Sequence, residues 1–412
     1  AADQASVVNH TGSGALILDD ANGLTRTVTA SGTGALTVSA DVAGTDTLVG
    51  SSGDDRFVFG AALTTADTVT GGEGTDTLVI EGDDLGAGNY TKVTGVEILE
   101  IDSDNATGGT DNVDFKVFTG TTFTTVNIDL IANNDHVILT DTEASTFGVT
   151  SGNAATLDHL DEVTVTLLDA SATTDEITIN LNQKSSGAAG ATQNEFDIQT
   201  FNVEGIETIT INADSISSTL TADDIVIQAL VDSTESLTTL NIAGDADFQI
   251  DSDIIASVTT VNASSATDAV TLAFADSATK TSVVSYTGGS GVDTLSFGTS
   301  LTSADSVDGG GGTDVINATF SSGTVTPANI TAVETFNATF SGGALNATNL
   351  GDLSTLKITN STASTVVSGL QSTTSTITQV LNGTQNNAIN LQYASGAAAT
   401  VTLNNTGAGA NI

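Results

Sequence analysis

The segment Gly50–Val79 recurs without a gap as Gly288–Asn317, with 16 of 30 positions identical. Both copies contain a nine-residue pattern, Gly-Gly-x-Gly-x-Asp-x-U-x, in which U is a large apolar residue. The pattern is complete in Gly71–Val79, Gly288–Ser296 and Gly309–Asn317. A glycine-rich nonapeptide repeat of this kind is typical of a parallel β-solenoid, in which each coil packs on the next one. This feature limits the possible folds more than any other in the chain.

The spacing of the repeats predicts the length of a coil. Two nonapeptides make 18 residues, and a three-residue insert, Phe59–Ala61 or Phe297–Thr299, lengthens the coil to 21. Weaker Thr-rich repeats elsewhere recur at offsets of 20 and 21 residues, as between Leu240 and Val261. We therefore expect both kinds of repeat to stack on one axis, in an all-β fold of parallel β-roll or β-helix solenoid segments with little helix.

The residue types of the nonapeptide indicate a metal ion. Its glycines allow a tight turn with positive φ, which aims backbone carbonyl oxygens inward. The aspartate at position six adds a carboxylate, and six to eight hard oxygen ligands at about 2.3–2.6 Å suit Ca²⁺. We therefore predict several Ca²⁺ ions as cofactors. The predicted metal-site residues are Gly44, Asp46, Gly53, Asp55, Asp67, Gly72, Gly74, Asp76, Gly289, Gly291, Asp293, Asp305, Gly310, Gly312 and Asp314.

A site of this kind needs turns from two adjacent coils, so an aspartate should pair with the one a coil later. The predicted pairs are Asp46 with Asp67, Asp55 with Asp76, and Asp293 with Asp314. Asp305 would face Val284 instead, which predicts an incomplete site. The alternative interpretation is a set of Gly/Asp-rich loops that bind no metal.

The charge of the chain favours cations as partners. It has 50 acidic residues and seven basic ones, and a formal net charge of −43. Nucleic acid and anionic membrane surfaces require Lys/Arg patches, so we expect neither as a partner. Bound Ca²⁺ would reduce the self-repulsion, although an acidic surface adapted to salt or solubility is an alternative explanation. No apolar run is long enough for a transmembrane segment, and none is expected.

Composition divides the chain into three segments. Residues 1–100 form a β segment with the first glycine-rich block (41–79), and residues 101–285 form a Thr-rich β-solenoid segment. Residues 286–412 contain the second block (288–317) and a C-terminal β segment. One short helix is predicted near 221–230, because an N-cap threonine and two acidic residues precede an apolar run.

Motifs that carry catalysis are missing from the sequence. It has no H-E-x-x-H zinc-protease helix and no G-x-S-x-G nucleophile elbow, and its three histidines lie in unrelated contexts. Seven scattered Lys and Arg residues cannot easily line a groove for an acidic polysaccharide. We therefore predict no catalytic residues and no enzyme activity.

The complete nonapeptides resemble those of the RTX (repeats-in-toxin) family of type I-secreted, calcium-binding bacterial proteins. The remaining sequence is rich in Thr, Ser, Gly and Asp, is nearly free of Lys, and has Val-Glu-Thr-like strand ends such as Val333-Glu334-Thr335. In this it looks like Gram-negative S-layer proteins of the RTX type. The resemblance implies export, an extracellular location on the cell surface, and calcium that orders the solenoid and bridges subunits into a lattice.

Three functions remain as hypotheses. The first is a structural protein of an S-layer or extracellular matrix, which self-assembles with Ca²⁺ and has itself as partner, with cell-surface glycan or lipopolysaccharide as a further partner. The second is an RTX-type adhesin fragment that binds a surface or a glycan. The third is an extracellular polysaccharide-active enzyme with a divergent active site.

Overall fold

The structure, a computed structural model, divides the chain into two compact units. Unit 1 comprises residues 1–206 and 214–222, and unit 2 comprises residues 207–213 and 223–412. The described residues are 7–19, 26–40, 42, 44–81, 85, 88–103, 110–130, 135–143, 145–150, 158–169, 174–183, 195–215, 224–274, 283–359, 361–374, 376–380, 389–394 and 402–406. The compositional boundaries at 100/101 and 285/286 stay predictions.

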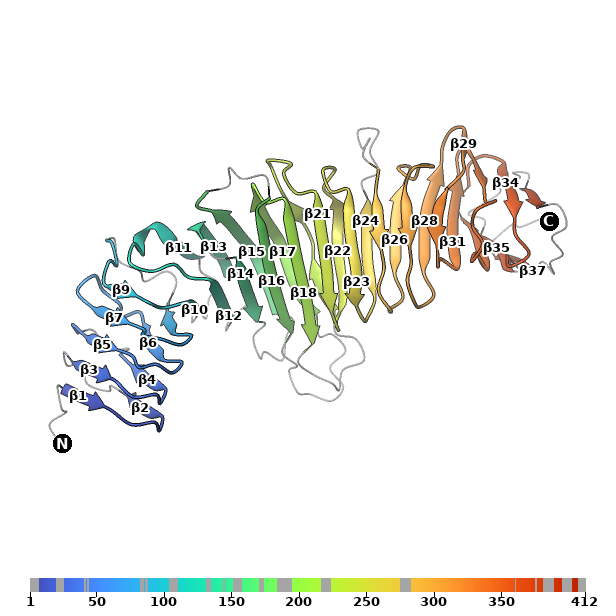
Figure 1. Ribbon diagram of the computed structural model, residues 1–412. Coiled ribbons are helices and arrows are strands. Elements are labelled where there is room, and N and C mark those ends of the chain that lie inside the picture. The colour runs from blue at the N-terminus through green and yellow to red at the C-terminus, as the bar shows by residue number, and fades with distance from the viewer. Residues whose placement is uncertain are drawn as a thin grey trace. The chain divides into compact units, whose positions relative to one another are not determined.

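Unit 1 is a parallel β-solenoid, in which successive coils add strands to the same sheets (Figure 1). Its sheets have the strand orders β1-β3-β5-β7-β9, β2-β4-β6-β8-β10-β12-β14-β16 and β11-β13-β15-β17. The strands are β1 (Val7–His10), β2 (Leu16–Asp19), β3 (Thr27–Ala30), β4 (Leu36–Ser39), β5 (Thr47–Val49), β6 (Arg56–Gly60), β7 (Thr68–Thr70), β8 (Thr77–Ile80), β9 (Val93–Thr94), β10 (Ile98–Ser103), β11 (Thr110–Asp114), β12 (Thr125–Leu130), β13 (Asp135–Thr142), β14 (Thr146–Thr150), β15 (Asp158–Leu167), β16 (Glu176–Gln183) and β17 (Glu195–Glu204).

Unit 2 is built in the same way, with the strand orders β18-β21-β23-β25-β27-β30, β19-β22-β24-β26-β28-β31-β33-β35-β37 and β29-β32-β34-β36 (Figure 1). Its strands are β18 (Thr208–Ser215, whose last two residues fall in unit 1), β19 (Asp224–Ile227), β20 (Leu230–Val231), β21 (Thr239–Gly244), β22 (Asp247–Ile254), β23 (Thr260–Ala266), β24 (Val270–Phe274), β25 (Ser285–Thr287), β26 (Thr294–Gly298), β27 (Ser306–Asp308), β28 (Val315–Phe320), β29 (Thr324–Val325), β30 (Asn329–Thr331), β31 (Thr335–Phe340), β32 (Ala344–Asn346), β33 (Thr355–Thr359), β34 (Thr365–Leu370), β35 (Thr376–Val380), β36 (Ile389–Tyr393) and β37 (Thr402–Thr406).

The registers of these sheets confirm the predicted coil lengths. Leu16 pairs with Leu36, an offset of 20 residues, and Leu240 pairs with Val261, an offset of 21. Strands of the glycine-rich blocks and of the Thr-rich segments belong to the same sheets: β8 of the first block pairs with β10, which pairs with β12. Each unit is therefore a continuous stack of coils in which the blocks are sections of the solenoid.

The strands alternate between core and surface side chains. In β3 the central Val28 is completely buried, while Thr27 and Thr29 are only partly buried on the other face. The same alternation in β31 buries Phe336 and Phe340 and leaves Thr335 only partly buried. Because β-branched threonine suits the outer face of a pleated strand, the Thr-rich composition is compatible with a thin core filled by Val, Ile, Leu and Phe.

The helix predicted near 221–230 was wrong. In the described part of that segment, residues 224–227 form strand β19 and residues 230–231 form strand β20. Ile225, Val226 and Ile227 are all buried, and the run pairs in parallel with residues 247–250 of β22. Three successive β-branched residues favour a strand, and pairing with a neighbouring coil outweighed the local capping signal. The described residues contain one short 3₁₀ helix, Phe115–Val117.

The turns before β10 and β31 require a left-handed residue, which is Gly95 (φ +61°) in unit 1 and Ala332 (φ +51°) in unit 2. A Cβ resists this conformation by about 1 kcal/mol. At Gly95 an added Cβ would find its nearest neighbour, Gly72 N, at 3.7 Å, so only the backbone strain would matter.

Two separate substitutions, Gly95→Ala and Ala332→Gly, should therefore change the free energy of unfolding in opposite directions. We expect Gly95→Ala to destabilise unit 1 by about 1 kcal/mol. Ala332→Gly should stabilise unit 2 by about 0.5 kcal/mol, because the relief of strain is partly offset by the greater freedom of glycine in the unfolded chain. Urea unfolding followed by circular dichroism would measure both. A destabilised Ala332→Gly variant would contradict the strain argument.

Candidate functional site

The predicted aspartates form hydrogen-bonded ladders along each block, with a separate ladder for each of its two sheets, and we call these the carboxylate ladders. In each step the Oδ1 atom of one aspartate accepts the backbone N–H of the residue one coil earlier. Asp46 N donates to Asp67 Oδ1 at 2.7 Å, and Asp55 N donates to Asp76 Oδ1 at 2.8 Å. In the second block, Asp293 N donates to Asp314 Oδ1 at 2.7 Å. The structure thus brings together all three pairs that the coil length predicted.

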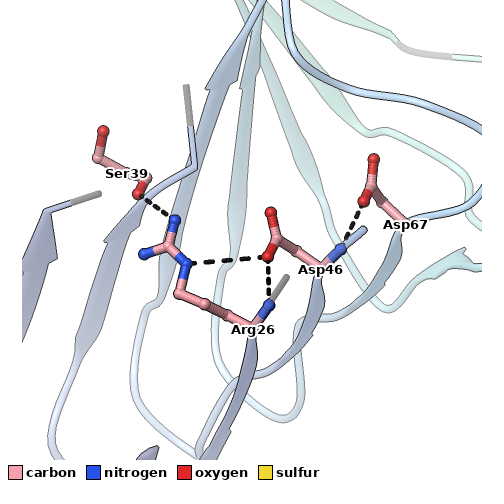
Figure 2. A network of polar contacts seen from close by, with 4 residues as sticks. All are labelled: Arg26, Ser39, Asp46 and Asp67. Carbon is pink, nitrogen blue, oxygen red and sulfur yellow. Dashed lines mark hydrogen bonds and ion pairs between the residues drawn. The ribbon is translucent and has the colours of Figure 1, made fainter. Parts of the chain in front are cut away.

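The Asp46–Asp67 ladder of the first block begins at a buried arginine (Figure 2). Arg26 N donates to Asp46 Oδ1 at 2.8 Å, and Arg26 Nε lies 3.8 Å from the same oxygen. The guanidinium also donates through Nη2 to the carbonyl oxygen of Ser39 at 3.3 Å. Arg26 is only 8% exposed and Asp46 only 2%. A permanent positive charge of the protein therefore lies beside the first predicted metal ligand.

Asp67 and Asp305 have both carboxylate oxygens engaged by the protein. Besides the ladder bond to Oδ1, Asp67 Oδ2 accepts the N–H and the hydroxyl of Thr64, each at 2.8 Å. Asp305 repeats this arrangement with Thr302, at 2.6 and 2.9 Å. Its Oδ1 accepts the N–H of Val284, the residue predicted to face it. These two carboxylates hold their turns together, and their part in metal binding stays a prediction.

Asp55 and Asp293, the first aspartates of the Asp55–Asp76 and Asp293–Asp314 pairs, also accept hydrogen bonds from neighbouring groups. Asp55 Oδ1 accepts the N–H of Leu36, and its Oδ2 accepts the N–H of Ser51. Asp293 Oδ2 accepts the hydroxyl of Tyr286 at 2.7 Å. Burial raises the pKa of the Asp293 carboxyl, and the hydrogen bond from Tyr286 acts in the opposite direction.

Asp76 and Asp314, the second aspartates of the Asp55–Asp76 and Asp293–Asp314 pairs, differ because one oxygen of each has no donor. Asp76 is 0% exposed and Asp314 is 3% exposed, yet in the described part of the chain the Oδ2 atom of each accepts no hydrogen bond. An unpaired buried carboxylate oxygen is strongly unfavourable. Each Oδ2 atom therefore requires a proton, a water molecule or a cation as its partner.

Burial also shifts the titration of these two carboxyls. Burial raises the pKa of Asp76 from 3.8 to about 6, the backbone N–H of Asp55 lowers it, and the charges of Asp55, Glu97 and Asp54 raise it further. The pKa of Asp314 is raised to about 6 for the same reasons. Both groups therefore carry a negative charge at neutral pH in a place that disfavours it.

The predicted glycines allow this geometry in two ways. Gly72 and Gly74 have positive φ, at +125° and +113°, as do Gly310 and Gly312 in the second block. Others are required for close approach: a Cβ on Gly289 would lie 2.0 Å from the carbonyl oxygen of Ala266. Gly291 is confined by Asp268 O and Gly53 by Thr33 O, whereas Gly44 lies in the turn before Asp46.

Three members of the carboxylate ladders were missed by sequence reasoning. Glu97 Oε2 accepts the N–H of Asp76, and Glu334 Oε2 accepts the N–H of Asp314, both at 2.9 Å. Their signal was present, since the Val-Glu dipeptides follow the last aspartate of each block by one coil length, although they precede strands β10 and β31 and do not end strands as the sequence suggested. Arg26 occupies the ladder position one coil before Asp46, but no pattern distinguishes it.

The oxygen atoms of these turns can bind a hard cation only if backbone carbonyl oxygens act as ligands beside the carboxylates. Among the residues that the structure describes, no group of three or more Asp, Glu and His side chains is placed to hold a metal ion. Carboxylate and carbonyl oxygens together are the usual ligands of Ca²⁺, and the glycine-rich turns bring carbonyl oxygens within reach. The residues present are thus compatible with calcium bound mainly by backbone oxygens.

No family model, curated protein or solved structure matches this chain. Within the described residues, no helix is long and apolar enough to span a membrane.

Proposed function

We propose that this chain is a structural, calcium-dependent protein of the cell surface, which self-assembles into an S-layer or an extracellular matrix. The observation that carries the proposal is the pair of buried Asp76 and Asp314 Oδ2 atoms without a hydrogen-bond donor, each in a glycine-rich turn of a β-solenoid. The resemblance of those turns to RTX nonapeptides supports calcium as the ion and export as the route. A structural role also agrees with the lack of catalytic motifs in the sequence.

Calcium would act as a folding ligand in this proposal. A site that binds only the folded chain stabilises it by about 2.7 kcal/mol when the free ion is at a hundred times its dissociation constant. With a net charge of −43, the chain also repels itself, and bound cations reduce that repulsion. The solenoid would therefore be weakly stable where calcium is scarce and stable outside the cell, where extracellular modules bind it at about millimolar concentrations.

Calcium removal should unfold or disassemble the protein. We expect purified chain in millimolar calcium to show strong β-sheet circular dichroism, an unfolding temperature that rises with calcium, and sheets or filaments by electron microscopy. Excess EGTA should lower the unfolding temperature of the folded chain and abolish the sheets or filaments, and magnesium at the same concentration should not replace calcium. An unchanged unfolding temperature and particle size in EGTA would contradict the proposal.

The second candidate is an RTX-type adhesin, and the same preparation separates the two. Ordered arrays formed in calcium favour the surface-layer role. A chain that folds with calcium but remains monomeric at high concentration would favour the adhesin, and binding to glycan or lipopolysaccharide would then be the next measurement.

A further inference from the structure

The turn that follows each glycine-rich block has the same construction in both units. In unit 1 it is Gly95-Val96-Glu97, and in unit 2 it is Ala332-Val333-Glu334. The first residue of each turn is left-handed, and the glutamate accepts the N–H of the last ladder aspartate. Neither turn contains a nonapeptide, and neither belongs to the predicted Asp–Asp sites.

The left-handed residue places its carbonyl oxygen against the preceding coil. A Cβ added to Gly71 would lie only 1.7 Å from the carbonyl oxygen of Gly95 and 2.3 Å from Asp76 Oδ2. In unit 2, a Cβ on Gly309 would lie 2.0 Å from the carbonyl oxygen of Ala332 and 2.5 Å from Asp314 Oδ2. In both blocks, the carbonyl and the carboxylate oxygen therefore face the same small space beside a glycine.

These two oxygens cannot satisfy each other. A carbonyl and an ionised carboxylate are both acceptors only, so neither oxygen can donate to the other, whereas one cation could bind both. The Oδ2 atoms of Asp76 and Asp314 are buried and accept no hydrogen bond from the described residues. The glutamate of the same turn adds negative charge close by, since Glu97 Oε2 lies 2.9 Å from Asp76 N and Glu334 Oε2 lies 2.9 Å from Asp314 N. This surrounding favours a divalent cation over a neutral molecule.

We propose that a further calcium site closes each glycine-rich block, between the last ladder aspartate and the turn one coil later. Its ligands are Asp76 Oδ2 with the carbonyl oxygen of Gly95, and Asp314 Oδ2 with the carbonyl oxygen of Ala332. Glu97 and Glu334 end their ladders and supply the second negative charge. The site lies on the opposite side of Asp76 from Asp55, so it is additional to the predicted pair. It rests on the proposed calcium dependence.

The test is the number of calcium ions bound by the full chain, measured by equilibrium dialysis and atomic emission. Glu97→Gln and Glu334→Gln keep an oxygen that can accept the backbone N–H and remove only the charge. We expect each variant to lose one ion, or to bind it at least tenfold more weakly, and the double variant to lose two. The matched control is Glu73→Gln, an exposed glutamate of the same block, which should bind as the wild type does.

A second measurement, on the wild-type chain, tests the proposal even if the variants do not fold. Hydrogen exchange of the wild-type chain should show calcium-dependent protection of the backbone amides of residues 95–98 and 332–335. A double variant with unchanged stoichiometry and affinity overturns the closing sites, and so does protection confined to the turns before Asp55 and Asp293. A wild type that binds no calcium overturns the proposed function itself, which makes the two failures distinguishable.

Discussion

Replacing Arg26 with methionine is expected to destabilise unit 1 by about 3–5 kcal/mol. Arg26 is 8% exposed and its Nε lies 3.8 Å from Asp46 Oδ1, so the substitution leaves a buried carboxylate without its compensating charge. Methionine has a similar length and keeps the packing of the aliphatic stem. The loss should appear in urea unfolding of calcium-free protein at neutral pH.

The matched control for this prediction is Arg56→Met. Arg56 also pairs with a carboxylate, Glu100, but its side chain is 40% exposed. A pair of that kind contributes about 0–1 kcal/mol, because solvent screens it. Equal losses in the two variants would contradict a special role for Arg26. The Arg26→Met variant should also gain more stability from added calcium than the wild type, because the ion can replace part of the missing charge beside Asp46.

The amino-acid sequence predicts the parts of the site that follow the repeat, such as the Asp55–Asp76 pair. It does not predict Arg26, which belongs to no repeat pattern. The pairing of Asp55 with Asp76 depends only on coil length, and two nonapeptides with one insert determine that length. The turns that hold the carboxylates likewise follow from the glycine pattern. In a solenoid each coil contacts only its neighbours, so the number of residues in a coil directly gives the register between adjacent strands.

The sequence did not predict which carboxylate oxygens accept hydrogen bonds, because the donors are single side chains outside the repeat pattern. Thr64 satisfies Asp67, and Tyr286 satisfies Asp293, whereas Asp76 has no such neighbour for its Oδ2 atom. The same limit applies to residues 224–227, where pairing with β22 determined the strand. Contacts between neighbouring coils determine both the hydrogen bonds of the aspartates and the strand at residues 224–227, and these contacts cannot be read from one repeat.

The stability of the calcium-free chain should fall as pH rises through about 6. The carboxyls of Asp76 and Asp314 have a pKa of about 6 in the folded protein and an ordinary value of 3.8 when unfolded. The folded state therefore binds more protons between these values, and stability is lost as pH increases. Each group contributes a loss of up to about 3 kcal/mol between pH 4 and pH 7. The charged groups that face them are Asp54, Asp55 and Glu97 for Asp76, and Asp293, Asp308 and Glu334 for Asp314.

Asparagine at position 76 should imitate the protonated acid. Its Oδ1 atom can still accept the N–H of Asp55, and its amide can donate to the carbonyl oxygen of Gly95. Calcium-free Asp76→Asn should thus be more stable than the wild type at neutral pH, by up to about 3 kcal/mol, with a flatter pH profile. It should also gain less from added calcium, because the ion loses its carboxylate ligand.

Asp67→Asn should behave in the opposite way, although it removes the same charge from the same block. Asp67 Oδ2 already accepts two hydrogen bonds from Thr64, so the asparagine amide would place a donor against a donor. Leaving buried polar groups unpaired costs about 1–3 kcal/mol. Urea unfolding of both variants in calcium-free buffer at neutral pH would therefore give shifts of opposite sign. Shifts of the same sign would mean that overall charge, and not the unpaired oxygen of Asp76, determines how these turns respond to protons and calcium.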